Sequence, residues 1–329
     1  MSLRVLVVVP NWLGDAVMAL PAIADLRRAM PEATVDLAAR PSVAPLATLV
    51  PGVGATVPLG SRRERVDRVR AGRYDAALLL PNSFQSAWVV WKAGVPERWG
   101  FRRDLRAPLL TRAIVPPVRV HQAAYYQTLT TALGFSPGPL EPRLTLTPDA
   151  RERGDALLSE AGWTDGHAPL IAMAPGAAYG GAKRWPAPAY AELLDALAGD
   201  GVRTVLVGAR GDMPASAEVR ATARTGAGAI DLTGRTDLPA LAGVLARCRA
   251  LVTNDSGAMH LAAALGTDVV ALFGPTNESE TRPLGPVRAR VLHTGVWCRP
   301  CMLRECPLTH RCMTGIAPAV VAQEARASL

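Results

Sequence analysis

The residues best suited to chemistry lie in the stretch TNDSGAMHLAAALGTDVVALFGPT, residues 253–276. An apolar run leads into Asp255, Ser256 and Gly257, and a helix of small residues and a second apolar run follow. This pattern predicts a strand, a loop, a helix and a strand, with the polar residues where the helix begins. Backbone N–H groups and the helix dipole favour an anion there, and His260 lies one turn further on. The alternative is that Asp255 or Ser256 only caps the helix.

A second polar loop carries a cation. Residues 170–174 are an apolar run that predicts a strand, and the loop PGAAYGGAKRWP follows, with Lys183 shortly before a helix that begins near Pro188. Glycines and a lysine ahead of a helix suit phosphate oxygens, although the spacing is not the Walker pattern. Because both loops follow strands of one predicted parallel sheet, we expect Lys183 to point toward the same edge as Ser256.

The first loop of the chain has the opposite charge. Residues 3–9 predict a buried strand, and PNWLGD follows with a single glycine and Asp15. A dinucleotide-binding domain would have Gly-x-Gly-x-x-Gly here, and a carboxylate in that place repels a pyrophosphate. The helix dipole favours the ionised form of Asp15, which suits it to accept a proton from a hydroxyl. An N-cap is the alternative interpretation.

Polar residues also follow later strands. Asn82 and Ser83 come after the strand predicted for residues 76–80, beside the crevice that Asp15 is expected to face. Residues 98–106, RWGFRRDLR, are too polar for a core and predict a loop that meets acidic groups of a substrate, or a solvated surface loop. Asp212 follows the strand of residues 203–207, where an acidic residue often binds ribose hydroxyls; alternatively it caps the next helix.

The length and the turn residues predict two domains. A chain of 329 residues is about twice a typical domain, and residues 136–148 contain four prolines and little helical pattern. We expect an α/β protein with two Rossmann-like domains facing one another across a cleft, an N-terminal domain of residues 1–148 and a C-terminal domain of residues 149–315. Residues 316–329 predict a helix that could pack back on the first domain.

Composition limits the class of protein. The net charge of +8 is carried mostly by arginine, which attracts phosphates, anionic lipid or nucleic acid, or reflects a compositional bias. No basic motif interleaved with aromatic residues is present, so nucleic acid is not expected as a partner. No apolar run reaches the ~18 residues that span a bilayer, and the start predicts a strand and not a signal peptide. A cytoplasmic protein is expected.

Four cysteines lie within fifteen residues, in CRPCMLRECPLTHRC. Five cysteines in a chain of this length do not make a disulfide scaffold. Closely spaced thiols in the cytosol favour a tetrahedral metal, with structural zinc preferred over an iron–sulfur or redox role, and free thiols are the alternative. The candidate ligands are Cys298, Cys301, Cys306 and Cys312.

Four motifs resemble those of the bacterial lipopolysaccharide heptosyltransferases, glycosyltransferase family 9: NWLGDAVMALPAI, LLLPNSF, PGAAYGGAKRWP and TNDSGAMHLAAAL with FGPT after it. They occur in order over most of the chain. The resemblance implies a GT-B fold, an inverting reaction without a metal at the reaction centre, and ADP-heptose (L-glycero-D-manno) as donor. It also implies the inner-core oligosaccharide of lipid A as acceptor, reached by peripheral contact with the inner membrane.

The resemblance also implies roles for single residues. Asp15 matches the carboxylate that acts as general base, and Lys183 matches the lysine of the mobile loop at the donor phosphates. Relatives carry threonines ahead of that lysine, where this chain has Ala178 and Tyr179. The other matching donor-binding residues are Asp212 at the ribose, Leu238 near adenine, and Asp255, Ser256, Gly257 and His260 at the diphosphate. The acceptor-binding residues expected from the first half are Asn11, Asn82, Ser83, Arg102 and Arg103.

Three alternatives stay open from the sequence. A family 9 enzyme that adds a sugar at another position of the inner-core oligosaccharide would carry the same motifs. A nicotinamide-dependent dehydrogenase would need the glycine fingerprint that both loops lack. A metal-stabilised nucleic-acid-binding protein would use the basic surface and the cysteines.

Overall fold

The computed structural model describes residues 2–164 and 168–329, which form two compact units, Met1–Thr145 and Leu146–Leu329. The division lies three residues before the expected boundary at residue 148. Thr147 caps the first helix of unit 2, since its hydroxyl accepts a hydrogen bond from the N–H of Ala150 at 3.2 Å. Pro148, which reads as linker, is therefore the first residue of that helix, where a proline is favoured.

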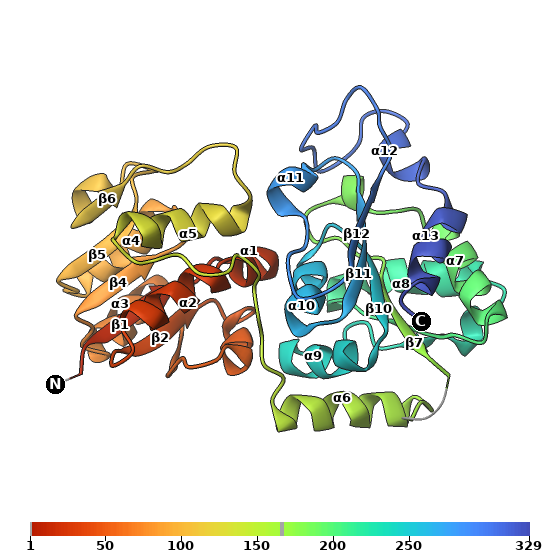
Figure 1. Ribbon diagram of the computed structural model, residues 1–329, viewed down its shortest axis with the longest axis horizontal. Coiled ribbons are helices and arrows are strands. Elements are labelled where there is room, and N and C mark those ends of the chain that lie inside the picture. The colour runs from red at the N-terminus through yellow and green to blue at the C-terminus, as the bar shows by residue number, and fades with distance from the viewer. Residues whose placement is uncertain (1, 165–167) are drawn as a thin grey trace. The chain divides into compact units, whose positions relative to one another are not determined.

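Unit 1 is a parallel sheet of six strands in the order β3-β2-β1-β4-β5-β6 (Figure 1). Helices α1, α2 and α5 pack together on one face, and α3 and α4 on the other. The strands are β1 (Arg4–Val8), β2 (Thr34–Ala39), β3 (Thr56–Pro58), β4 (Ala76–Leu79), β5 (Glu97–Phe101) and β6 (Arg112–Ile114). The helices are α1 (Leu13–Met18), α2 (Leu20–Ala29), α3 (Arg62–Ala71), α4 (Phe84–Lys92) and α5 (Gln122–Ala132), with 3₁₀ turns η1 (Ala44–Leu49) and η2 (Ala107–Leu109).

Unit 2 repeats this topology, with the order β12-β11-β10-β7-β8-β9. Its strands are β7 (Leu170–Ala174), β8 (Arg203–Leu206), β9 (Ile230–Asp231), β10 (Ala250–Asn254), β11 (Asp268–Phe273) and β12 (Ala289–His293). Its helices are α6 (Pro148–Glu160), α7 (Ala187–Gly199), α8 (Met213–Thr222), α9 (Leu238–Arg247), α10 (Gly257–Leu265), α11 (Glu278–Thr281), α12 (Arg311–Thr314) and α13 (Pro318–Arg326). Three 3₁₀ turns interrupt the loops: η3 (Gly181–Lys183), η4 (Arg210–Asp212) and η5 (Gly226–Gly228). The predicted α/β class with two Rossmann-like sheets is confirmed.

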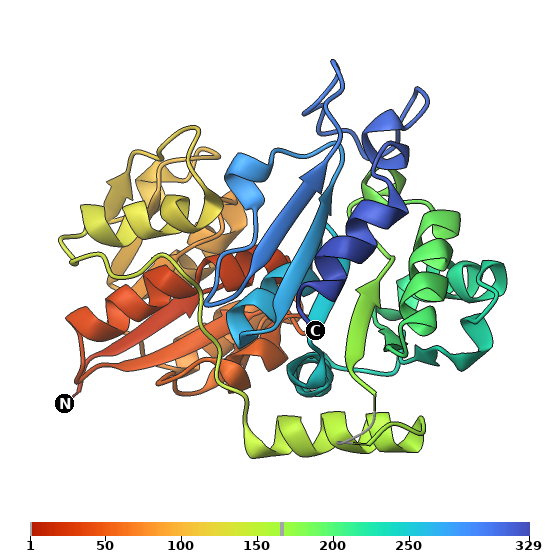
Figure 2. The same cartoon turned by 45° about the vertical axis from the view of Figure 1, so that its right-hand side comes forward.

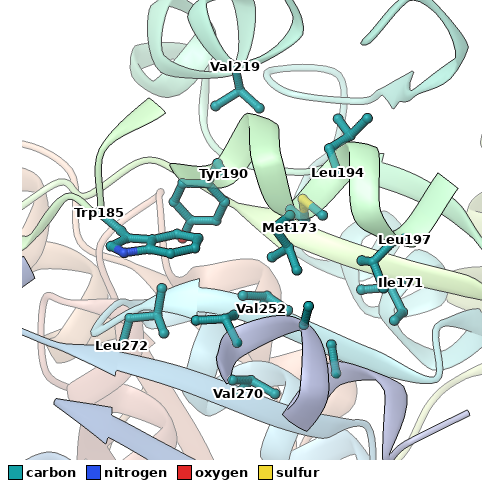
Figure 3. Close-up of a cluster of buried hydrophobic side chains, with 14 of the residues drawn as sticks. Ile171, Met173, Trp185, Tyr190, Leu194, Leu197, Val219, Val252, Val270 and Leu272 are labelled. Carbon is teal, nitrogen blue, oxygen red and sulfur yellow. The ribbon is translucent and has the colours of Figure 1, made fainter. Parts of the chain in front are cut away.

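The core of unit 2 explains the continuous apolar runs in its strands. Side chains from β7, β10 and β11 pack under α7, α8 and α13, and Figure 3 shows Val252 and Leu272 below the rings of Trp185 and Tyr190, with Met173 beside them. The two rings meet edge to face with their centroids 4.9 Å apart, an arrangement that aromatic pairs favour. A strand covered on both faces has no reason to alternate polar and apolar residues.

The C-terminal helix belongs to unit 2. Val321, Ala322 and Ala325 of α13 are buried in the core just described, and α13 packs on α7, β10 and β11 (Figure 2). The expectation that this helix packs on the first domain is replaced by this packing. Its apolar residues recur at helical spacing, but that spacing contains no information on which sheet they cover.

One predicted helix is broken in two. The sequence indicates a single helix over residues 16–30, but α1 ends at Met18, and α2 begins at Leu20 with Pro21 in its first turn. Proline has no N–H to donate to the preceding turn, so a helix restarts there. The longest described helices have 13 residues, and no helix within the described ranges is long and apolar enough to cross a bilayer.

The strand order of each sheet reverses at its middle. In unit 1 the order reverses between β1 and β4, and in unit 2 between β7 and β10. Loops at such a point leave the sheet in opposite directions, which opens a crevice at the carboxyl ends of the two strands. The segments that follow these four strands contain Asp15, Asn82, Lys183 and Asp255.

Helices α6 and α9 pack so closely that only glycine fits at their crossing. A Cβ on Gly154 would lie 2.4 Å from the backbone carbon of Gly243. We therefore expect Gly154→Ala to lower the free energy of unfolding by about 1–3 kcal/mol, as overpacking does. Gly199→Ala, at the end of α7 with nothing within 4 Å of the new Cβ, is the control and should change it by less than about 0.5 kcal/mol. Equal losses in urea denaturation would contradict this packing.

Candidate functional site

A buried asparagine ties the lysine loop to the end of β10. Asn254 is fully buried, and its Nδ2 donates hydrogen bonds to the carbonyls of Pro175 at 2.9 Å and Gly176 at 3.1 Å. Its Oδ1 accepts from the N–H of Trp185 at 2.9 Å. The loop between residues 175 and 185 is thus held at both ends by one side chain. Asn254 lies in the stretch of residues 253–276, but the sequence pattern did not predict this role for it.

Lys183 and Asp255 form an ion pair across the crevice of unit 2. The lysine Nζ lies 2.6 Å from Oδ2 of Asp255, and Thr276 Oγ1 donates to the same oxygen at 2.7 Å. The side chains of Lys183 and Asp255 are 13% and 6% exposed. Lys183 Nζ also donates to the Asp255 carbonyl oxygen at 3.4 Å, and since an ammonium group has three N–H donors, one is left for a phosphate oxygen. The structure brings together the two loops that the sequence predicted at one edge.

The start of α10 is not capped by a side chain. Ser256 occupies the N-cap position, but its hydroxyl bonds with Thr253 Oγ1 at 3.0 Å, and the Asp255 carboxylate goes to Lys183. The alternative that either residue serves only as a side-chain cap is therefore wrong. Gly257 is the first residue of α10, and His260 is buried in its first turn. Backbone N–H groups at such a helix start attract anions.

Asp212 and Leu238 extend this edge toward β9. The Asp212 carboxylate accepts from the N–H of Ala209 at 2.9 Å and makes no cap bond to α8. It packs on Gly176, where a Cβ would lie 2.1 Å from Asp212 Cγ, so the glycine makes room for the acidic side chain. Leu238 is half-buried and begins α9 behind its cap Asp237. Following the sheet order, the donor residues form a row at the ends of β9, β8, β7 and β10.

The Cys-rich segment holds the lysine loop. Residues 302–310, which lie between the cysteines, contact residues 179–182 through four hydrogen bonds and so fix the turn that carries Lys183. These bonds are Tyr179 OH to Met302 O at 2.7 Å, Gly181 N to Glu305 Oε1 at 2.9 Å, Ala182 N to Arg304 O at 2.9 Å, and His310 Nε2 with Ala182 O at 2.7 Å.

Tyr179 also contacts the lysine directly. Lys183 Nζ lies 4.8 Å from the centroid of the Tyr179 ring, and the Arg304 guanidinium carbon lies 5.4 Å from it. A cation at this distance is attracted by the face of an aromatic ring. The tyrosine at a position where the resemblance implies a threonine therefore positions the ammonium group, which the sequence analysis missed.

The four cysteines stay close enough to affect one another. Burial raises the pKa of the Cys312 thiol, and the neighbouring thiols Cys306, Cys298 and Cys301 raise it further. All four are free of disulfides. Over residues 2–164 and 168–329, no three His, Cys, Asp or Glu side chains are arranged to hold a metal ion. The structural zinc site stays a prediction.

In unit 1, Asp15 lies in the first turn of α1. Trp12 is the N-cap of this helix, so the interpretation of Asp15 as the N-cap is wrong. Asp15 is half-buried near Tyr126 of α5. Burial raises the pKa of Tyr126 well above its usual value, and the negative charge of Asp15 adds to this shift.

A pocket opens at the same edge of unit 1. It is lined by Asn11, Arg40 and Ser83, which follow β1, β2 and β4, and by Arg65 of α3. Two predicted acceptor residues, Asn11 and Ser83, therefore meet beside two arginines that the sequence analysis had not selected. Ser83 also caps α4, since its hydroxyl accepts from the N–H of Ser86 at 3.3 Å.

The other predicted acceptor residues do not line this pocket. Asn82 Nδ2 donates to the hydroxyl of Tyr125 at 2.8 Å, and its Oδ1 accepts from Arg106 Nη2 at 3.4 Å. Arg102 and Arg103 are exposed in the loop after β5. The structure thus separates the five predicted residues into a pocket pair, a half-buried amide and an exposed basic loop.

The prediction that residues 98–106 form a polar loop is wrong for most of its length. Trp99 and Phe101 are buried in β5, and the Arg106 side chain is fully buried. Arg106 donates to the carbonyl oxygens of Phe101 at 2.8 Å and of Pro81, and to Ser86 Oγ at 3.0 Å. Burial lowers the pKa of Arg106 to about 10. Composition missed this because a buried arginine satisfied by backbone oxygens reads as a surface residue.

Comparison with known proteins agrees with the fold of two parallel sheets. Residues 62–311 match glycosyltransferase family 9 (heptosyltransferase). The chain is 36% identical to lipopolysaccharide heptosyltransferase 2 of Salmonella typhimurium over 310 residues, 88% of each chain. It is 36% identical to the Escherichia coli enzyme of the same name over 313 residues, again 88% of each. The solved structure of E. coli ADP-heptose lps heptosyltransferase II is similar with a TM-score of 0.86 and 34% identity, covering 99% of this chain and 98% of that one.

Replacing Asn254 tests whether it holds the lysine loop. Asn254→Leu, of similar size, leaves two buried carbonyls and the Trp185 N–H without partners, and each such group costs about 1–3 kcal/mol. We expect thermal unfolding to show a loss of about 3 kcal/mol or more. Tyr190→Phe is the matched control, because it removes one hydroxyl, which lies 3.3 Å from both Asn254 Oδ1 and the carbonyl oxygen of Ala174, and should cost about 1 kcal/mol. A smaller loss for Asn254→Leu than for the control would be evidence against this role.

Proposed function

The chain belongs to glycosyltransferase family 9, the heptosyltransferases, and we propose that it transfers L-glycero-D-manno-heptose from ADP-heptose to the inner core of lipopolysaccharide. The relatives at 36% identity are both heptosyltransferases 2, so the second heptose addition is the activity proposed. A family member acting at another core position, heptosyltransferase I or III, is the alternative.

The observation that carries the proposal is the order of residues along the edge of the second sheet. Leu238, Asp212 and Lys183 follow β9, β8 and β7, and Ser256 follows β10 next to β7. The donor has the same linear order of chemical groups: adenine, ribose and diphosphate. An apolar residue suits the base, a carboxylate suits ribose hydroxyls, and a lysine with a helix start suits the phosphates.

The proposed reaction is a single displacement. The acceptor oxygen forms a bond to the anomeric carbon of the heptose while the bond from that carbon to the β-phosphate oxygen breaks. The electron pair leaves with ADP, the acceptor proton passes to Asp15, and the anomeric configuration inverts. Negative charge grows on the β-phosphate, and Lys183 and the N–H groups at Ser256 stabilise it most when it is greatest. Because these groups supply the positive charge, the proposal needs no metal at the reaction centre.

The acceptor side of the proposal uses unit 1. Arg40 and Arg65 line the pocket with Asn11 and Ser83, and guanidinium groups bind phosphates and carboxylates in two-point contacts. The inner core carries such groups, so salt should weaken acceptor binding. We propose a cytoplasmic enzyme in peripheral contact with the inner leaflet, because its lipid-anchored acceptor lies there.

Replacing the proposed base tests the reaction directly. ADP-heptose, competing nucleotide sugars and defined truncated core acceptors are offered to the purified chain, and the product linkage is identified. Asp15→Asn keeps the shape of the side chain and should lower kcat about 10² to 10⁴-fold, the usual effect of a positioned base, with unchanged affinity for the donor. Turnover at the wild-type rate would remove Asp15 from this role, and no heptose transfer by the wild type would remove the function.

The role of Lys183 is testable because the chain has only one other lysine, Lys92. Lys183→Ala should lower kcat about 100- to 1,000-fold, as loss of one donor to a developing oxyanion does. Lys92→Ala, at the exposed end of α4, is the control and should leave the rate within about twofold, since surface changes act weakly.

Chemical labelling of the two lysines is a second test. Donor at about 100 times its Kd leaves about 1% of the binding sites empty, so it should slow the acylation of Lys183 by an amine-reactive reagent but not that of Lys92. Equal labelling of Lys183 with and without donor would contradict the assignment.

A further inference from the structure

Two loops of unit 1 carry exposed aliphatic side chains to the same edge of the sheet. Phe101 and Ile114 are paired at the ends of β5 and β6, and Arg102 N donates to Ile114 O at 2.8 Å. Residues 102–105 and 115–119 therefore leave the sheet side by side. Exposure reaches 91% at Leu105, 77% at Val118 and 59% at Val115. Aliphatic residues this exposed on two neighbouring loops commonly mark a surface that binds a partner.

The same loops are strongly basic. Arg102, Arg103 and Arg119 are exposed beside the three aliphatic residues, and Asp104 is the only acidic residue between positions 102 and 119. Cations that surround apolar side chains are complementary to an anionic bilayer, where phosphates lie just above the acyl chains. A protein–protein interface is typically enriched in aromatic residues and methionine, and residues 102–105 and 115–119 contain neither.

We propose that Arg102, Arg103, Leu105, Val115, Val118 and Arg119, the docking surface, bind unit 1 to an anionic lipid bilayer. The inference rests on the proposed function in one respect: a lipid-anchored acceptor requires the enzyme to work at a membrane. The arrangement of the surface itself is independent of the reaction.

The tip of the first loop is held in an unusual backbone conformation. Asp104 and Leu105 have φ of 51° and 58°, a region that residues other than glycine occupy only when their surroundings hold them there. The next residue, Arg106, does so from inside, by hydrogen bonds to Phe101 O, Ser86 Oγ and Asn82 Oδ1. Leu105 is thus presented to solvent by a rigid turn, which lowers the entropy lost when it binds.

Arg106 also links the docking surface to the acceptor side. Its partners include Pro81 and Ser86, which line the pocket together with Asn11 and Ser83. All these loops leave the carboxyl ends of neighbouring parallel strands, β1, β4, β5 and β6. One edge of the sheet therefore holds both the acceptor pocket and the surface that would rest on the lipid.

The test is co-sedimentation of the full chain with vesicles of phosphatidylethanolamine and phosphatidylglycerol in equal parts. The variant Leu105→Asp with Val118→Asp should bind at least about tenfold more weakly, since two apolar groups leave the interface and two charges enter it. Arg119→Gln alone should weaken binding about fivefold, and added salt should reduce this difference. Val320→Asp, at an exposed aliphatic residue of α13 in unit 2, is the control and should bind as the wild type does.

The outcomes separate the surface from the reaction. Wild-type turnover of a soluble, deacylated acceptor by Leu105→Asp/Val118→Asp, with loss of vesicle binding, supports the proposal. Equal vesicle binding by wild type and variant would overturn it, as would equal binding to pure phosphatidylcholine. If that variant loses turnover of the soluble acceptor while keeping vesicle binding, the loops bind sugar and the proposal is wrong. Failure of the wild type to transfer heptose at all would count against the function alone.

Discussion

Both units depend on the side chains that fill the crevice where the strand order of each parallel sheet reverses. At such a point the loops of two neighbouring strands diverge, and their backbone groups lose the partners that a regular crossover would provide. In unit 2, Asn254 supplies those partners to Pro175, Gly176 and Trp185 from one buried amide. The loop between residues 175 and 185 can then contain six glycine and alanine residues and still keep a defined position.

The charge at the crevice of unit 2 depends on whether lysine or arginine occupies position 183. The chain contains 36 basic residues and uses arginine in nearly all of them, yet Lys183 stands between Asp255 and the start of α10. A compact ammonium can bond the carboxylate and the carbonyl oxygen of Asp255 and still turn its third donor outward, whereas a planar guanidinium engages a carboxylate in two-point contact. Thr276 donates to the same carboxylate oxygen, so Asp255 holds the lysine without competing for all of its donors.

Sequence reasoning succeeded where chemistry lies at strand ends. A buried parallel strand reads as an apolar run, and the polar residues after it must reach the carboxyl edge, so Lys183, Asp255 and Asp212 could be placed together. It failed for Arg106 and Tyr179, because their partners are backbone oxygens and a ring from segments distant in the chain. The break at Ala19 was in principle readable from Pro21, whereas the sheet covered by α13 was not, since an apolar helical stripe fits either.

The two sheets share one strand order but use their crevices differently, and the difference begins with one residue type. In unit 2 a neutral amide, Asn254, closes the switch point, and the charges of Lys183 and Asp255 are left at the surface of the crevice. In unit 1 a cation, Arg106, is buried beside the switch point, and its hydrogen bonds go to neutral oxygens. Its positive charge, which the exposed carboxylate of Asp104 opposes in part, lies under the loop that carries Asn82 and Ser83, where it attracts anions. The same topology therefore yields an edge built around an ion pair in unit 2 and an edge that a buried cation makes positive in unit 1.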